Sequence, residues 1–459
     1  MAYGPFSGVE LEFDLNANPV DDANDALTLE AAVAPLIAGL QAANATDLIV
    51  ISHGWNNDKD EARALYDAFF ASAQALVAGG NFALPADRRA YVAAVIWPSA
   101  RFVDPSEIPG GAAGDVDPNL LLLQTQLAAL RAAFAGNAGA QASIDAALAA
   151  APNLDSDPNA AIAFVNAMNS LPSGDAEEND TITTAVSSAV AATQQPGADT
   201  DEQGLLATLA ANPPPGTAAA APASGAGGGD AGDSGGATGI FSNLKAGALS
   251  LASIFTYKTM KERAGVVGRT GLASVLGRVR TQFPNLRVHL AGHSFGARLV
   301  TSAANAPWNG SDATNQATTL ALLQGAFSHF GFAVNYLSLG HNGGFRDVVG
   351  KPTVTGSIAI THSSHDMAVG WAYPAASALL GQVASGLASA NPFGGMGADG
   401  AVSTPEAIFD DLGDVGHLYT PLPDRIRVRN LMGDPYISGH GDVTNKQVVY
   451  AFLVNAFGS

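Results

Sequence analysis

The chain has 459 residues, of which 47% are hydrophobic, enough for one large domain with an accessory region. It contains no cysteine, which excludes disulfides, thiolate metal ligands and a cysteine nucleophile. Its 21 basic and 41 acidic residues give a net charge of −20, which argues against nucleic acid or an anionic membrane as the main partner.

Six runs of apolar residues are predicted strands. Most of them are apolar throughout, which is typical of strands that are buried on both faces. A helical pattern in residues 60–79 separates the first two runs. Strands that alternate with helices predict an α/β fold with a doubly wound, mostly parallel sheet. The predicted strands are residues 47–55, 90–98, 287–292, 320–327, 354–364 and 425–432.

A long insertion separates the second predicted strand from the third. It spans about 190 residues, whereas a βαβ connection needs little more than about a dozen. Its first helix has Asp117 as a predicted N-cap, Pro118 at the first helical position and Gly136 after its end. Further alanine-rich helices are predicted at residues 139–151, 158–170, 181–194 and 201–211, and a helix pair at 253–285 leads back to the sheet.

Composition divides the chain into three regions. Residues 213–240 consist mainly of Pro, Ala, Gly and Ser, which bury too little apolar surface to offset the cost of ordering, so we expect a flexible linker. Residues 101–212 form the helical insertion, a possible cap or lid, and residues 1–100 and 255–459 form the main domain. The apolar stretch 239–257 either lines such a lid or packs the insertion onto the main domain.

Neither a signal peptide nor a transmembrane helix is expected. The N-terminal residues lack a basic start followed by an apolar stretch, and the chain has no uninterrupted apolar run of about 18 residues. A cytoplasmic location is therefore the default expectation, with export left open.

The stretch "LRVHLAGHSFGARLV", residues 286–300, combines a strand, a Gly-His-Ser-Phe-Gly turn and the start of a helix. Gly292 and Gly296 leave room for a sharp bend that exposes Ser294 with strained dihedral angles. A second Gly-x-Ser-x-Gly, around Ser234, lies in the predicted linker, where a catalytic serine could not be held rigidly. Ser294 is therefore the candidate nucleophile.

The chain resembles the α/β-hydrolase superfamily, because Gly292, His293, Ser294, Phe295 and Gly296 match its nucleophile elbow in the lipase and esterase form. The resemblance covers roughly residues 8–100 and 255–459. It implies an α/β-hydrolase fold and a catalytic triad in the chain order Ser, Asp or Glu, His. Many relatives carry a cap after the strand that follows the nucleophile, whereas the insertion here precedes the elbow.

The order of the triad selects its other two members. His440 follows the last predicted strand and precedes a C-terminal amphipathic helix, the place of the catalytic histidine in the superfamily; His417 is the alternative. The acid should follow the strand before that, where Asp366 lies; Asp347 and Asp434 are the alternatives. The carboxylate would hold the tautomer of the imidazole.

The segment His53-Gly54-Trp55 ends the first predicted strand and is similar to the esterase and lipase segments that supply an oxyanion hole. The resemblance implies that the backbone N–H groups of Trp55 and Phe295 bind the oxyanion.

Three hypotheses for the function follow. The first is a serine ester hydrolase, similar to esterases and lipases, that acts on a small-molecule or lipid-like ester and needs neither a metal nor an organic cofactor. The second is an amidase or peptidase with the same triad, and the third a catalytically silent binding protein. A metal site at His362, His365 and Asp366 is a weaker alternative, because these residues follow a strand and no second cluster of ligands is evident. His289 and His293 are expected to be structural.

Overall fold

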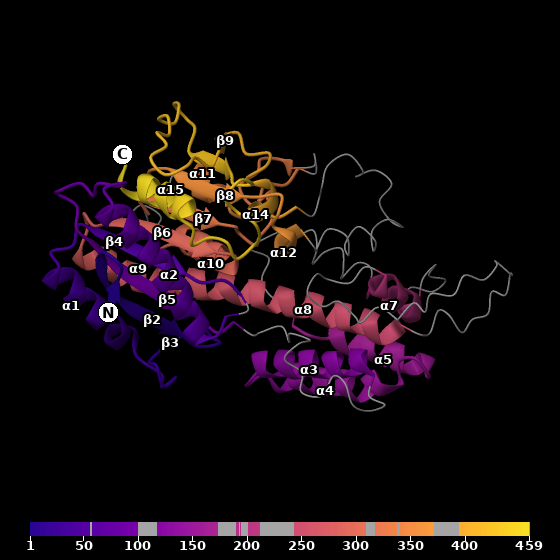
Figure 1. Ribbon diagram of the computed structural model, residues 1–459. Coiled ribbons are helices and arrows are strands. Elements are labelled where there is room, and N and C mark those ends of the chain that lie inside the picture. Colours follow the sequence, from indigo (N-terminus) through magenta and orange to yellow (C-terminus); the bar gives the residue numbers. More distant parts are fainter. Residues whose placement is uncertain are drawn as a thin grey trace.

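The protein is an α/β protein whose mixed, mostly parallel sheet carries helices on both faces (Figure 1). The computed structural model describes residues 1–55, 57–99, 117–172, 190–191, 193, 201–211, 243–308, 317–336, 340–351, 353–370 and 394–458. The predicted linker 213–240 and most of the predicted helix 181–194 lie outside these residues.

The sheet has ten strands in the described residues, in the order β1-β2-β5-β4-β6-β7-β8-β10-β9, with β3 paired to β2. The short strands β1 and β3 are antiparallel to β2, and the other neighbouring strands are parallel. The strands are β1 (Ala2–Tyr3), β2 (Phe6–Phe13), β3 (Pro19–Val20), β4 (Asp47–Ser52), β5 (Ala90–Ile96), β6 (Arg287–His293), β7 (Thr319–Leu323), β8 (Ile358–His362), β9 (Ala407–Asp411) and β10 (Val428–Met432).

All six predicted strands are present; β6 extends one residue beyond its predicted run, and the other five are shorter than the apolar runs that predicted them. Strand β2 was missed because Glu10 and Glu12 interrupt its apolar pattern. Both carboxylates are largely buried, and Arg63 and Lys59 of α2 (Lys59–Ala78) pair with them. Strand β9 was missed because its sequence, "AIFDD", is acidic and half-exposed, as expected at the edge of a sheet.

Successive residues of the central strand β4 contribute to two different cores. Leu48 and Val50 pack toward α1, α9 and α10, whereas Ile49 and Ile51 pack toward α2 and α15 on the other face. This alternation explains why the strand is apolar throughout. The covering helices are α1 (Leu29–Ala42), α2 (Lys59–Ala78), α9 (Ala273–Gln282), α10 (Phe295–Asn305) and α15 (Lys446–Phe457).

The insertion forms a helical region beside the sheet (Figure 1). The predicted N-cap is confirmed: the Asp117 carboxylate accepts a hydrogen bond from Asn119 N, and Pro118 is the first residue of α3. Near the end of that helix, Gly136 has a positive φ of 85°. The helices are α3 (Pro118–Ala133), α4 (Ala138–Ala150), α5 (Pro158–Asn169), α7 (Glu202–Ala210) and α8 (Leu244–Val266).

Helix α8 connects this region to the sheet. It contacts α3, α5 and α7 along one part of its length and α10 further on. It then continues through a π-helical segment, Val267–Leu272, directly into α9, so the predicted helix pair is one continuous helical run. The predicted domain boundary at residue 255 falls inside α8. Nearly every residue of α8 is buried, so its stretch 244–257 packs against other parts of the chain.

Strand β4 lies between β5 and β6. The chain runs from β4 to β5 on one side of it and later returns to form β6 on the other side, so the direction of the strand order reverses at β4. In open α/β sheets, ligands bind outside the carboxyl ends of the strands at such a reversal. The segments after β4 and β6 are those that carry the predicted oxyanion residues and nucleophile. Within the described parts of the chain, no helix is long and apolar enough to cross a membrane.

Candidate active site

Ser294 lies between the last residue of β6 and the first residue of α10. Its φ of 56° and ψ of −122° are strained for a residue with a side chain. The turn is tight: a Cβ atom on Gly292 would lie 2.2 Å from the carbonyl oxygen of Gly296, and one on Gly296 would lie 2.2 Å from that of Ser52. Only glycine therefore fits at both positions.

Three side chains from distant parts of the chain form a hydrogen-bonded relay. The Ser294 Oγ atom lies 2.7 Å from His440 Nε2, and His440 Nδ1 lies 3.0 Å from each carboxylate oxygen of Asp366. The Asp366 side chain is fully buried, and that of His440 is 22% exposed. Because the carboxylate can only accept, Nδ1 carries the proton and Nε2 is left to accept from the serine hydroxyl.

The turns that carry the acid and the histidine bind each other. Asp366 follows β8 and His440 follows β10, and these strands are parallel neighbours, so both turns emerge at one edge of the sheet. Ser363 Oγ donates to the carbonyl oxygen of Ile437 at 3.1 Å, and His365 Nδ1 lies 3.0 Å from the same oxygen. These contacts fix the distance between the carboxylate and the imidazole.

His293, which precedes the serine, holds the backbone of His440. Its Nε2 lies 2.9 Å from the carbonyl oxygen of His440, so that nitrogen carries a proton. Burial, together with the nearby His440, lowers the pKa of His293 to about 3, so the ring is neutral at pH 7. The expected structural role therefore consists of positioning His440.

The segment His53-Gly54-Trp55 follows β4 and lies against the nucleophile. A Cβ atom on Gly54 would lie 2.6 Å from Ser294 Cβ. The Trp55 ring stacks on Phe295, with ring centroids 5.6 Å apart. Phe295 begins α10, so its amide is among the first-turn groups that have no acceptor within the helix. The amides of Trp55 and Phe295 thus belong to the two segments that meet at Ser294.

His53 fixes the conformation of this segment. Its Nε2 accepts from Trp97 N at 3.2 Å, so Nδ1 carries the proton and donates to the Gly54 carbonyl oxygen at 2.8 Å. Burial lowers the pKa of His53 to about 4, which keeps it neutral.

The alternative triad residues have other partners. Asp347 pairs with Lys351 one helical turn further on. Asp434 accepts from the backbone N and Oγ of Ser364. The exposed His417 packs against the Tyr419 ring.

The alternative metal ligands also have separate contacts. His365 contacts Ile437 and Asp366 contacts His440, while the His362 ring packs against Phe409. No group of three or more His, Asp or Glu residues suited to a metal ion occurs in the part of the chain that the structure describes.

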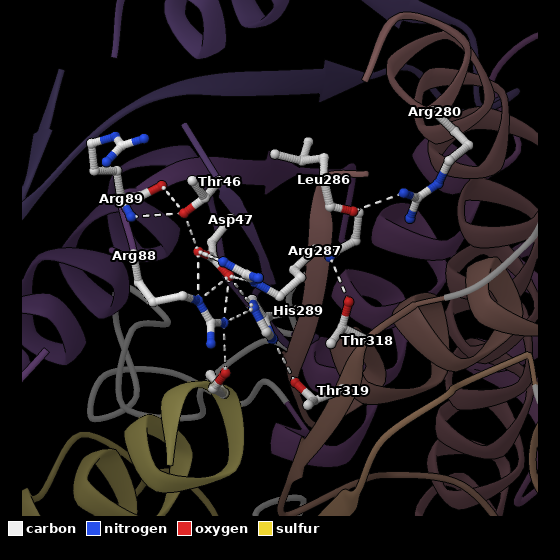
Figure 2. A network of polar contacts seen from close by, with 12 residues as sticks. Thr46, Asp47, Arg88, Arg89, Arg280, Leu286, Arg287, His289, Thr318 and Thr319 are labelled. Carbon is white, nitrogen blue, oxygen red and sulfur yellow. Dashed lines mark hydrogen bonds and ion pairs between the residues drawn. The ribbon is translucent and has the colours of Figure 1, made fainter. Parts of the chain in front are cut away.

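A separate polar network surrounds Asp47 at the amino ends of β4 and β6, on the opposite side of the sheet from the ends that carry Ser294 and Trp55 (Figure 2). His289 Nε2 lies 2.9 Å from the buried Asp47 carboxylate, and Arg88 and Arg287 also donate to it. Burial alone would raise the pKa of Asp47, but the hydrogen bonds from His289 and the two arginines hold it well below its usual range. This network joins strands and is remote from Ser294, in agreement with a structural role for His289.

A cavity of about 540 Å³ also lies away from Ser294, between the first residues of β7, β8 and β10 and the end of α15. Two of its arginines already have protein partners: Arg427 donates to the carbonyl oxygen of Val354, and Arg429 pairs with Asp410. It holds none of the triad side chains.

Sequence reasoning missed one side chain that contacts the triad. Gln324, at the end of β7, donates from Nε2 to Asp366 Oδ2 at 3.0 Å. From the sequence it lies inside the predicted strand 320–327, and its only signal is that it is a polar residue within an apolar run. Ser234, in the second Gly-x-Ser-x-Gly, lies outside the described residues.

Comparisons with known proteins give no relative: no family model, no curated protein and no solved structure matches this chain. The geometry described above is therefore the basis for a functional proposal.

Proposed function

We propose that this protein is a serine hydrolase of the α/β-hydrolase superfamily that cleaves carboxylic esters through an acyl-enzyme. The observation that carries the proposal is the relay from Ser294 Oγ through His440 to Asp366, with the serine on a strained turn between a strand and a helix. A base within hydrogen-bond reach of the nucleophile, itself oriented by a third group, is the arrangement that activates a serine.

In the proposed reaction, Ser294 Oγ attacks the carbonyl carbon of the ester while His440 Nε2 takes the hydroxyl proton. The amides of Trp55 and Phe295 stabilise the oxyanion of the tetrahedral intermediate. His440 then protonates the departing alcohol, which leaves the acyl group on Ser294. Water, deprotonated by His440, attacks the acyl-enzyme, and His440 returns that proton to Ser294 Oγ as the bond to the acyl group breaks and the acid leaves. Neither a metal nor an organic cofactor is required.

Asp366 has two roles in this proposal. Its carboxylate keeps the proton of the neutral His440 on Nδ1, so that Nε2 faces the serine. It also stabilises the imidazolium that forms during each attack.

An aromatic cluster beside the nucleophile supports a small-molecule or lipid-like ester as substrate. Tyr257 of α8 packs on Phe295 at 5.0 Å between ring centroids and on Trp55 at 6.0 Å. Tyr257 and Phe295 are buried, and Trp55 is partly exposed. Trp55 is therefore the ring of this cluster that can contact an apolar group of the substrate.

The first test measures hydrolysis of p-nitrophenyl esters, from acetate to palmitate, by the wild-type protein and by Ser294→Ala. We expect turnover that falls by about 10⁴-fold or more in the variant, because removal of a triad member leaves only oxyanion and binding contributions. The chain length with the highest kcat/KM would define the size of the acyl pocket.

The chain offers a matched control in Ser234→Ala, which alters the other Gly-x-Ser-x-Gly. This variant should keep full activity and full labelling by a fluorophosphonate probe. Faster turnover of a matched anilide than of the ester would favour an amidase or peptidase. A folded wild-type protein that neither turns over any substrate nor labels at Ser294 would favour a binding protein.

A further inference from the structure

The side chain of Gln324 binds the acid of the triad and the segment that covers it. Gln324 is fully buried directly after β7. Its Nε2 donates to Asp366 Oδ2 at 3.0 Å and to the carbonyl oxygen of Gly397 at 3.0 Å. The backbone N of Val369 donates to the other carboxylate oxygen at 3.2 Å. Both oxygens of Asp366 thus have a donor besides His440.

We propose that Gln324 is a positioning residue of the proposed hydrolase, which holds the Asp366 carboxylate in the orientation that His440 requires. The inference rests on the proposed function for its effect on turnover. The contact between Gln324 and Asp366 can also be tested without turnover.

The orientation of the Gln324 amide follows from its neighbours. A flipped amide would place Oε1 about 3.0 Å from two acceptors, the Asp366 carboxylate and the Gly397 carbonyl, which would repel it. In the observed orientation Oε1 is buried without a hydrogen-bond partner among the described residues. Such a group costs about 1–3 kcal/mol. The same amide group offsets this cost, because its Nε2 donates to Asp366.

The backbone around Gln324 also holds the nucleophile. Ser294 N donates to the carbonyl oxygen of Leu323 at 3.1 Å, and Ala326 N donates to that of Ser294 at 3.1 Å. Gln324 itself has a φ of 47°, a conformation that side chains rarely adopt, and its N donates to Thr361 Oγ1 at 3.2 Å. One turn therefore binds the backbone of the serine and the carboxylate of the acid, which are the two ends of the relay.

The segment around Gly397 covers the Asp366 carboxylate and packs closely against it, so the carboxylate has little room to move. A Cβ atom on Gly397 would lie 2.7 Å from Asp366 Oδ2 and 2.6 Å from the backbone carbon of Gln324. Two titratable side chains lie on the side of the carboxylate away from Gly397. His440 binds the carboxylate, and the His293 ring packs against the His440 ring. Without the Gln324 donor, His440 Nδ1 would be the remaining hydrogen-bond partner of Oδ2 among the described residues, and a small rotation of the carboxylate would weaken its bond to His440.

The test compares Gln324→Met, which keeps the length of the side chain but removes the donor, with the wild type. We expect kcat to fall by about 100-fold, as for a misplaced catalytic group, with KM within about 2-fold. Gln126→Met is the matched control, because Gln126 is also buried and donates from Nε2 to a side chain, Thr256 Oγ1 at 2.8 Å, in the helical region. That control should keep its kcat.

Gln324→Glu is the second variant and tests the donor specifically. The introduced carboxylate would face Asp366 and lower kcat at pH 8, whereas its protonated form could again donate. The pH of maximal kcat/KM should therefore move to lower pH than in the wild type. An unshifted profile, or a Gln324→Met variant with wild-type kcat, would overturn the proposal. Should the Met variant fail to fold, the pH profile of the Glu variant decides.

A measurement without substrate separates this inference from the proposed function. The proton shared by His440 Nδ1 and Asp366 should give a far-downfield NMR resonance at low pH, which Asp366→Asn removes. In Gln324→Met this resonance should shift or disappear, while Gln126→Met should leave it unchanged. An altered resonance in a protein without esterase activity would support the positioning role and refute only the proposed reaction. An unaltered resonance would refute the positioning role.

Discussion

Gly54 packs so closely against the proposed nucleophile that its position has no room for a side chain. A Cβ atom there would lie 2.6 Å from Ser294 Cβ and 3.2 Å from His293 Nδ1, so the segment that carries Trp55 would have to move. We expect Gly54→Ala to lower kcat/KM by about 100-fold or more, the cost of one lost oxyanion donor. Steady-state kinetics with the best p-nitrophenyl ester would measure it.

The control for this substitution is Gly350→Ala, where the nearest atoms to the added Cβ belong to the flexible side chain of Arg346, at 3.4 Å or more. It should leave kcat/KM unchanged. Full activity in Gly54→Ala would show that the segment after β4 does not contribute to the oxyanion site.

At the residue scale, the members of the proposed triad could be selected from the sequence, but their supporting contacts could not. Ser294 has a local signature, and the order of the chain selects His440 and Asp366 once the resemblance is accepted. Gln324 has no such signature, because its proposed role depends on a hydrogen bond to Asp366, which is 42 residues away in the chain. His293 likewise acquires its role from the His440 carbonyl, which approaches only in the folded chain.

At the element scale, the π-helical segment between α8 and α9 packs unusually close to its neighbour. A Cβ atom on Gly268 would lie 2.1 Å from the carbonyl oxygen of Leu299 in α10. We expect Gly268→Ala to reduce the free energy of unfolding by about 1–3 kcal/mol, because backbone must shift to relieve the overlap. Because α10 begins at the elbow, turnover should fall as well. Urea unfolding would measure the loss of stability.

The matched control is Gly139→Ala in α4, where the added Cβ meets only Asn137 Oδ1 at 3.6 Å. Alanine favours a helix, so this change should leave stability within about 1 kcal/mol of the wild type, on the stabilising side. Equal effects of the two substitutions would contradict the close contact between Val267–Leu272 and α10.

The helices were predicted better than their connections. The N-cap at Asp117 is a local signal, and it was found. The start of α8 has no local capping signal, because its cap comes from the segment between α4 and α5. The Asp155 carboxylate there accepts from Leu244 N at 3.1 Å. The continuity of α8 with α9 was missed because Gly265, Gly268 and Gly271 suggest a break, whereas Gly268 and Gly271 allow close packing.

At the scale of the whole molecule, buried neutral histidines make stability depend on pH. The pKa of His53 falls to about 4 and that of His293 to about 3 in the folded protein, against about 6.5 when unfolded. The unfolded chain therefore takes up protons first as the pH falls. The stability that these residues contribute is complete above about pH 6.5 and is lost progressively toward pH 4 and 3.

At pH 5 the loss should be about 2 kcal/mol for each of the two histidines. The free energy of unfolding in urea, measured at pH 7 and pH 5, would reveal it. In His293→Gln the difference between the two pH values should shrink by about 2 kcal/mol. An identical difference in the variant and the wild type would mean that His293 is protonated in the folded protein.

The sequence by itself determined the α/β class, the six apolar strands and the elbow, because each depends on residues that are close together in the chain. Continuous apolar runs require burial on both faces, and a tight turn around Ser294 requires glycine at positions 292 and 296. Only the tertiary structure decided which side chains support the proposed triad and how the insertion joins the sheet. Gln324, Asp155 and His293 act on partners far away in sequence, and such contacts have no periodicity or local composition from which they could be predicted.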